Sequence, residues 1–265
     1  MQAGIWLQSV RVCIAAAGTL AMASVAFAAD EAACTPGQGD AATVASVLDG
    51  RTLRLADGSA VRLAGIEVAS RESVRPALAS LIADREITLH RLGTDRYGRT
   101  LAHAFVPSRE PGQPAVWLQH ALVEKGHARV AARTGDSTCT GKLLQAEAAA
   151  RAARLGLWGE PAYLVRRAEK PADISAERGR FAVVEGRVVS VRESGGTIYV
   201  NFGRRWSEDF TVTVPKRNER TFTAAGFELK SLAGRNVRVR GYVEERGGPW
   251  IEAFEPSQIE VIGRN

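Results

Sequence analysis

Two Asp-Gly pairs, at positions 49–50 and 57–58, divide one stretch of the sequence into three short apolar runs. Aspartate and glycine tolerate the backbone conformations that tight hairpin turns require, so each pair favours a turn. The runs lie at 43–48, 52–55 and 61–63. Runs this short fit strands and not helices. This part of the chain is therefore predicted to form a sheet of short antiparallel strands.

Helical and extended patterns follow in the next hundred residues. Apolar residues at helical spacing predict a helix over 74–82, with Ser73 as its N-cap. Two more helices are expected, and Gly126 and Gly156 fit the left-handed position after each. These helices span 116–125 and 143–154, and strands are expected at 87–92 and 101–106. The pattern predicts a mainly β fold with helices (α+β), in which helices pack on a small barrel.

A second domain is indicated by a change in the pattern. Residues 163–178 are charged, contain Pro171 and show no regular periodicity, so we expect a linker there. Alternation then returns in about five short strands. A helical or turn-rich insert at 223–233 falls where a Greek-key OB barrel has its helix. We therefore predict one domain at 41–162 and an OB-like domain at 179–265.

The first 28 residues have the pattern of an export signal. Arg11 precedes a largely small and apolar stretch, and Ala26-Phe27-Ala28 fits a cleavage site. A membrane anchor is the alternative, but the apolar run is short and a polar boundary follows it. Residues 29–40 would then be a flexible lead-in. We expect an exported protein, periplasmic or secreted, with no stable membrane anchor after cleavage; the oligomeric state stays open.

Removal of that signal would leave two cysteines, Cys34 and Cys139. In an oxidising compartment such a pair is expected to form a disulfide. Two free thiols are the alternative, because a bridge requires the Cα atoms to lie within about 7 Å. Neither cysteine has the neighbours of a zinc site. The formal net charge of +6 suits a polyanionic partner.

Four segments together resemble the thermonuclease (staphylococcal-nuclease-like) family. They are Val47-Leu48-Asp49-Gly50-Arg51-Thr52-Leu53-Arg54-Leu55, Val61-Arg62-Leu63-Ala64-Gly65-Ile66-Glu67, Asp95-Arg96-Tyr97-Gly98-Arg99-Thr100-Leu101-Ala102, and the stretch 143–158 that ends in Gly156-Leu157-Trp158. The resemblance spans about 41–161. It implies a five-stranded OB barrel with three helices, and a calcium-dependent attack by water on a phosphodiester.

The phosphate half of that chemistry is retained. Arg62 and Arg99 match the two arginines that brace the phosphate in the family, where a planar guanidinium donates two parallel hydrogen bonds. Tyr97 lies in the same loop as Arg99 and is expected to help hold the nucleotide. The alternatives are an exposed strand charge for Arg62 and a turn residue for Arg99.

The metal half is altered. Family members read Asp-Gly-Asp-Thr where this chain has Arg51, and a guanidinium cannot coordinate calcium. Glu67 stands at the position of a second metal-binding aspartate and keeps a carboxylate. Ser70 replaces the usual general base, and a shifted loop would be needed to recruit Glu72 instead. No histidine is assigned a role.

Two main hypotheses follow. In the first, Arg51, Arg62 and Arg99 form an anion pocket that binds nucleic acid or another phosphate polyanion and cleaves it poorly or not at all. In the second, the protein is an active calcium-dependent nuclease that uses Glu67 and Glu72. A guanidinium of Arg51 at the metal position would count against the second. Arginines that merely pair with nearby acids, and a purely structural module, are further alternatives.

The second domain has its own candidate residues. Arg238, Arg240 and Tyr242 share one face of a strand by the period-two rule. Interleaved arginine and aromatic side chains suit single-stranded nucleic acid, and 202–206 adds similar chemistry. The strand pattern loosely resembles bacterial OB-fold modules of the tRNA-anticodon-binding type. The alternative is a solvated face whose arginines are balanced by acids at 185, 193, 208, 209, 244 and 245.

Overall fold

The computed structural model describes residues 1, 34–35, 39–68, 74–83, 85–135 and 137–263. The predicted export signal, Ser70, Glu72 and the proposed cap Ser73 lie outside these residues. The chain divides into two units, Met1–Glu31 and Ala32–Asn265, and everything below concerns the second. No helix in the described ranges is long and apolar enough to cross a membrane.

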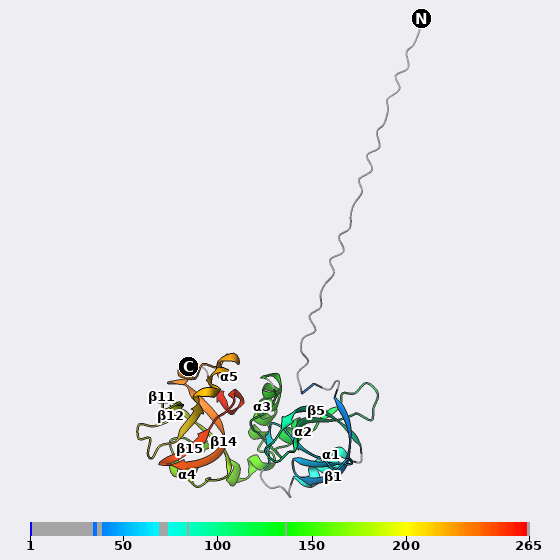
Figure 1. The fold of residues 1–265 in the computed structure, drawn as a ribbon, viewed down its shortest axis with the longest axis horizontal. Coiled ribbons are helices and arrows are strands. Elements are labelled where there is room, and N and C mark those ends of the chain that lie inside the picture. The colour runs from blue at the N-terminus through cyan, green and yellow to red at the C-terminus, as the bar shows by residue number, and fades with distance from the viewer. Residues whose placement is uncertain (2–33, 36–38, 69–73, 84, 136, 264–265) are drawn as a thin grey trace. The chain divides into compact units, whose positions relative to one another are not determined.

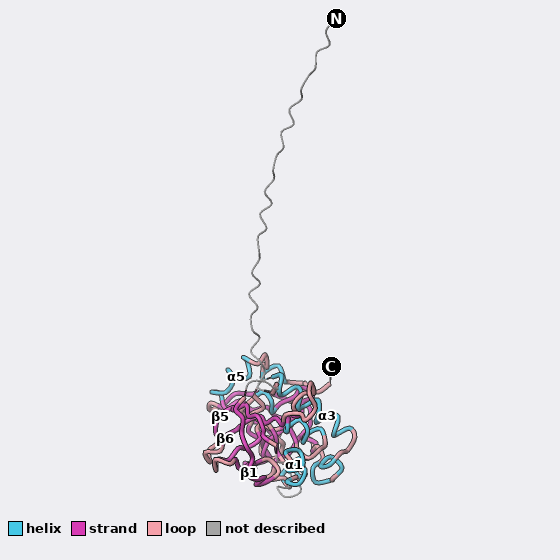
Figure 2. The backbone as a smooth tube through the Cα atoms, turned by 90° about the vertical axis from the view of Figure 1, so that its right-hand side faces the viewer, coloured by secondary structure: helices cyan, strands magenta, loops and turns pink. Residues whose placement is uncertain are grey.

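The first barrel is a sheet in the order β3-β2-β1-β5-β6-β7, closed by a parallel pairing of β3 with β6. Its strands are β1 (Asp40–Asp49), β2 (Thr52–Leu55), β3 (Ala60–Leu63), β5 (Glu86–Thr94), β6 (Thr100–Val106) and β7 (Val116–Trp117). Figure 2 shows β1, β5 and β6 side by side. The closed ring consists of β1, β2, β3, β5 and β6, and β7 pairs with β6 outside it. The expected closed five-stranded barrel with packed helices is confirmed.

Both Asp-Gly pairs form turns of this barrel, for different reasons. Gly58 adopts the left-handed conformation, with φ of 82°, between the paired strands β2 and β3. Gly50 is needed for space instead, because a Cβ at this position would lie 2.8 Å from the Cβ of Val74. The turn at Gly50 thus packs directly on the segment that starts the first helix.

Three helices pack on the barrel, with bounds that differ from those expected. They are α1 (Arg75–Ile82), α2 (Leu118–Glu124) and α3 (Ser137–Ala152). Residues 116 and 117 belong to β7 and not to the second helix. Gly126 is left-handed after α2 as predicted. After α3 the first left-handed residue is Arg154, with φ of 53°, and Gly156 is left-handed as well, with φ of 49°. Gly156 also lies against Gly126, where a Cβ on either would meet backbone atoms.

A second sheet follows in the order β11-β12-β13-β15-β14-β10-β9, with β16 paired to β14. Several of its strands are labelled in Figure 1, which also shows α3 next to both this sheet and the first barrel. The strands are β9 (Arg166–Arg167), β10 (Phe181–Arg187), β11 (Ser190–Ser194), β12 (Thr197–Asn201), β13 (Thr211–Pro215), β14 (Asn236–Arg246), β15 (Gly248–Glu252) and β16 (Ile259–Val261). The strand pairings of the described residues do not close this sheet on itself, so the predicted OB-like barrel stays a prediction; "second barrel" is used below only as a short name for this sheet with its helices.

Helical segments of the second barrel lie close to where they were expected. Between β13 and β14 the chain forms η3 (Lys216–Asn218), α5 (Glu219–Ala224) and η4 (Leu229–Leu232). The segment 163–178, expected as a linker, instead contains β9 and α4 (Pro171–Ser175), and Ile174 is fully buried in the second core. One inward-facing isoleucine is a weak signal among so many charges.

Each sheet encloses its own apolar core. One core is built by residues between 34 and 146, and the other by residues between 168 and 259. A small third cluster joins Ala150 and Trp158 to Phe181 and Val183 on β10. Remaining short elements are β4 (Ile66–Glu67), which pairs with β8 (Arg129–Val130), and the 3-10 turns η1 (Gly156–Gly159), η2 (Pro161–Tyr163) and η5 (Pro256–Gln258).

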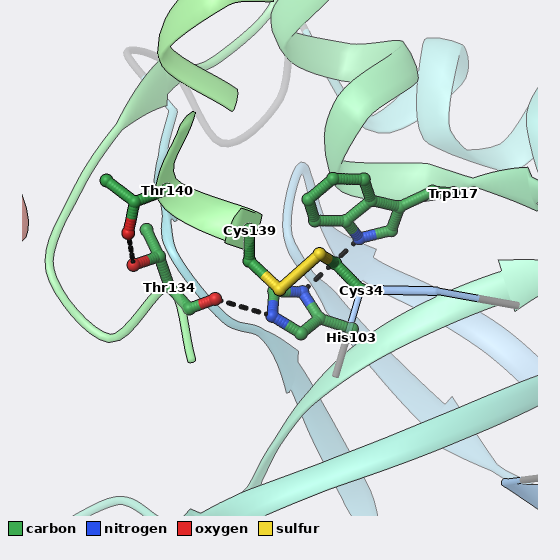
Figure 3. The surroundings of a disulfide bond; sticks show 6 residues. All are labelled: Cys34, His103, Trp117, Thr134, Cys139 and Thr140. Atoms are coloured by element: carbon green, nitrogen blue, oxygen red, sulfur yellow. Dashed lines mark hydrogen bonds between the residues drawn. A yellow bond between two sulfur atoms is a disulfide. The ribbon is translucent and has the colours of Figure 1, made fainter. Parts of the chain in front are cut away.

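The predicted disulfide between Cys34 and Cys139 is confirmed, with Cα atoms 5.4 Å apart. Both cysteines are buried, beside His103 (Figure 3). Trp117 donates to Nδ1 of His103 at 3.2 Å, so Nε2 carries the proton and donates to the carbonyl of Thr134 at 2.8 Å. His103 is therefore held by structural hydrogen bonds, in keeping with the absence of an assigned role.

Candidate functional site

The carboxylate of Glu67 lies at the centre of the candidate site. Its Oε2 accepts hydrogen bonds from Nη1 of Arg51 and, at 2.7 Å, from the hydroxyl of Tyr242. Nη2 of Arg62 lies 4.0 Å from the same oxygen. The side chain of Glu67 is only 11% exposed. A single buried carboxylate is thus shared by two arginines of the first barrel and a tyrosine of the second.

Arg51 reaches this position because of the turn between β1 and β2. Its backbone N–H donates to Oδ1 of Asp49 at 2.9 Å, an interaction that stabilises the turn. The guanidinium is buried and also donates to the carbonyl of Ile66 at 3.1 Å. Its Nε is buried without a hydrogen-bond partner among the described residues. The turn therefore places a cation where the family pattern has a metal-binding carboxylate.

Arg62 lies on β3 between two core residues, so the alternation of the strand turns its side chain away from the core. Burial, followed by the positive charge of Arg51, lowers the pKa of Arg62 below its ordinary value. Glu67 acts in the opposite direction, and Arg99 lowers the pKa further. An arginine keeps its proton at neutral pH, so Arg62 is a partly buried cation that lies close to two further cations and one carboxylate.

Arg99 follows the turn between β5 and β6 and is fixed by an acid of the same loop. Its Nε donates to Oδ2 of Asp95 at 2.7 Å, and Asp95 Oδ1 also accepts from the backbone N–H of Arg99 at 3.1 Å. The guanidinium lies 5.1 Å from the ring centroid of Tyr97, and that of Arg96 lies 4.8 Å from it. Tyr97 itself is 66% exposed. This loop presents an open aromatic ring flanked by cations.

The described residues around Glu67 do not fit a calcium site. Calcium requires six to eight oxygen ligands, largely carboxylates. Glu67, the predicted weak ligand, already accepts from Arg51 and Tyr242, and a guanidinium repels a divalent cation. The described residues contain no group of three or more His, Cys, Asp or Glu side chains suited to a metal. Glu72, the predicted alternative base, lies outside them.

Arg129 is a site residue that the sequence did not indicate. It lies on β8 directly opposite Glu67 and is almost fully buried. Its guanidinium lies 5.3 Å from the ring centroid of Tyr163 and 5.0 Å from that of Phe181. Burial lowers the pKa of Arg129, and the charge of Glu67 acts against this. No motif marks this arginine, because only the pairing of β4 with β8 brings it to Glu67.

The arginines of the second barrel are not arranged as predicted. Arg240 is 0% exposed and donates to Glu147 on α3 at 2.8 Å and to Glu260 at 3.2 Å. Arg238 pairs with Glu260 at 2.9 Å and with Glu185. The three residues of this strand do share a face, but Arg238 and Arg240 are paired with acids there, whereas Tyr242 is 49% exposed. The full burial of Arg240 excludes its direct contact with nucleic acid.

The other aromatic and basic segment, 202–206, is divided between core and solvent. Phe202 is buried, whereas Trp206 is 75% exposed. Arg205 donates to Glu208 at 2.8 Å, as the alternative of balanced surface charges predicts. The segment is remote in sequence from the residues around Glu67, and no described contact joins it to them. It is therefore not included in the candidate site.

Known proteins with related sequences were found for part of the chain. A sequence model described as "Staphylococcal nuclease homologue" matches residues 71–160. "Protein ParB" of Escherichia coli is 33% identical over 132 residues, which cover 44% of this chain and 72% of that protein. "Micrococcal nuclease" of Shigella flexneri is 30% identical over 128 residues, covering 44% of this chain and 73% of that protein.

Proposed function

Because the chain belongs to the staphylococcal nuclease family, we propose that it binds nucleic acid or another phosphate polyanion and that its phosphodiesterase activity is lost or much reduced. One observation carries this proposal: the buried guanidinium of Arg51 donates a hydrogen bond to the carboxylate of Glu67 and forms an ion pair with it. The charge that a metal would need is thereby neutralised within the protein. The presence of Arg51 in place of the family's aspartate also adds a cation next to Arg62.

The phosphate-bracing arginines remain suited to an anion. Arg62 lies beyond hydrogen-bond distance of Glu67, at 4.0 Å, and its side chain is 20% exposed. Arg99 is 25% exposed and is oriented by Asp95. Guanidinium groups held in this way bind phosphate oxygens with little further loss of side-chain freedom. Tyr97 then offers an exposed ring on which a base can stack.

We also propose that the protein is exported. The signal pattern motivates this, and the buried disulfide between Cys34 and Cys139 supports it, because such bonds persist in oxidising compartments.

We expect Arg62→Ala and Arg99→Ala each to weaken binding of single-stranded DNA or RNA by about tenfold at low salt, since each removes a charge-assisted phosphate contact. The slope of log affinity against log salt should become shallower by about one for each. Fluorescence anisotropy with a labelled oligonucleotide measures both. Arg54→Ala, an exposed arginine on the neighbouring strand, is the matched control and should bind normally. Failure of the unaltered protein to bind at low salt would refute the proposal.

The alternative function is an active calcium-dependent nuclease with a non-standard carboxylate set. The retained carboxylate of Glu67 favours it, together with a relative whose name is that of a nuclease. Incubation of single-stranded DNA with the mature protein, in calcium and in chelator, separates the two proposals. Calcium-dependent cleavage that disappears in Arg99→Ala would establish the alternative and overturn the loss of activity.

Arg51→Asp restores the aspartate of the family pattern and tests whether Arg51 is what excludes the metal. In the unaltered protein, calcium should leave the thermal unfolding midpoint unchanged. In Arg51→Asp, two neighbouring carboxylates should bind calcium, and the midpoint should rise by about 3 to 6 °C at calcium tenfold above its Kd. Arg54→Asp controls for surface binding. Equal calcium responses in all three proteins would contradict the role given to Arg51.

A further inference from the structure

Tyr242 belongs to the second barrel, yet its hydroxyl is bound in the site of the first. The hydrogen bond to Oε2 of Glu67, at 2.7 Å, joins residues 175 positions apart in the chain. The ring of Tyr242 packs edge-on against Phe181, with centroids 5.7 Å apart. Phe181 is the direct cross-strand neighbour of Tyr242 on β10. The position of the ring is therefore set by the second barrel itself.

The strand that carries Tyr242 is anchored firmly to the first barrel. Two residues earlier on β14, the fully buried Arg240 donates to Glu147 on α3 at 2.8 Å and to the carbonyl of Val130 on β8 at 3.3 Å. Glu147 also accepts from the backbone N–H of Val130 at 2.7 Å. Because β8 pairs with β4, this anchor and Glu67 belong to one connected structure. The hydroxyl of Tyr242 is thus held at a defined position next to the carboxylate of Glu67.

The contact affects how Arg51 and Arg62 share the carboxylate of Glu67. Arg51 and Tyr242 both donate to Oε2 of Glu67, whereas Arg62 remains 4.0 Å away. If Tyr242 no longer donated to Glu67, the carboxylate would lack one hydrogen bond, and Arg62, 4.0 Å away, is a cation that can replace it. Pairing with Glu67 would remove Arg62 from any phosphate. A bound tyrosine hydroxyl prevents that competition.

We infer that the second barrel is a working part of the phosphate site, in which Tyr242 positions Glu67 against Arg51 and so keeps Arg62 available for phosphate. The inference rests on the proposed binding function and gives the second barrel a role in it. Burial, and then the nearby charge of Glu67, raise the pKa of Tyr242, so its hydroxyl stays protonated and able to donate at neutral pH. Tyr242 is a positioning residue here and not a phosphate ligand.

The test compares Tyr242→Phe, Glu67→Gln and the double variant by anisotropy with a labelled single-stranded DNA at low salt. Tyr242→Phe should bind about three- to tenfold more weakly, the range expected for one hydrogen bond. Glu67→Gln should bind at least as tightly as the unaltered protein, because the competing charge is gone. In the Glu67→Gln background, Tyr242→Phe should have no further effect, a rescue that a purely structural role would not produce.

Tyr199→Phe, on β12 of the same barrel, is the matched control and should leave affinity unchanged. Thermal unfolding of each variant establishes that it is folded. Equal affinities of the unaltered protein and Tyr242→Phe would overturn the inference while leaving the proposed function intact. A loss that persists in the Glu67→Gln background would also overturn it. Absence of binding by the unaltered protein would refute the proposed function and this inference with it.

Discussion

Arg240→Met is expected to lower the free energy of unfolding by about 3 to 5 kcal/mol, because it leaves a buried carboxylate without its main partner. The Arg240 and Glu147 side chains are 0% and 1% exposed, and their charged groups lie 2.8 Å apart. Methionine is similar in length and fills space adaptably, so the loss reports the charge and not a cavity. Urea unfolding followed by tryptophan fluorescence measures the change.

Two further variants decide whether the buried charge causes this loss. Adding Glu147→Gln to Arg240→Met removes both charges and should recover a substantial part of the stability. Arg178→Met removes an exposed arginine that pairs with Glu245 at 3.4 Å, and should cost less than about 1 kcal/mol. Similar small losses for Arg240→Met and Arg178→Met would show that the barrels are not held together by this pair.

Replacing both Cys34 and Cys139 by alanine is expected to lower the free energy of unfolding by about 2 to 5 kcal/mol. The bridge joins residues 105 positions apart, so it restricts the unfolded chain strongly. In the folded protein it connects the segment before β1 to the first turn of α3. Denaturant unfolding of the oxidised protein and of the double alanine variant gives the difference directly.

A reductant provides the internal control for the disulfide. Both cysteines are buried, so the folded protein should keep its bridge, whereas the unfolded chain is reduced. With reductant present throughout, the unfolding midpoint of the unaltered protein should therefore fall toward that of the double alanine variant. The variant itself should not respond. A midpoint of the unaltered protein that is insensitive to reductant at equilibrium would contradict a stabilising bridge.

Local patterns were sufficient for much of the fold. The Asp-Gly turns and short alternating runs indicated the strands of the first barrel, because turn chemistry and side-chain alternation act within a few residues. Errors occurred where a distant contact decided the local conformation. Gly156 is left-handed as expected, but Arg154 is the first left-handed residue after α3, and the local pattern did not reveal the close approach of Gly156 to Gly126.

For the candidate site, too, the sequence determined some features and the tertiary structure decided others. Residue identity alone determined that Arg51 stands where a metal ligand was expected, and that Arg62 and Arg99 were retained. Only the tertiary structure decided what these residues contact. Arg240 and Tyr242 lie on one strand face, as alternation requires, yet Arg240 is fully buried against Glu147, and the hydroxyl of the half-exposed Tyr242 donates to Glu67. Strand periodicity specifies which side chains share a face, whereas the packing of distant segments determines what covers that face.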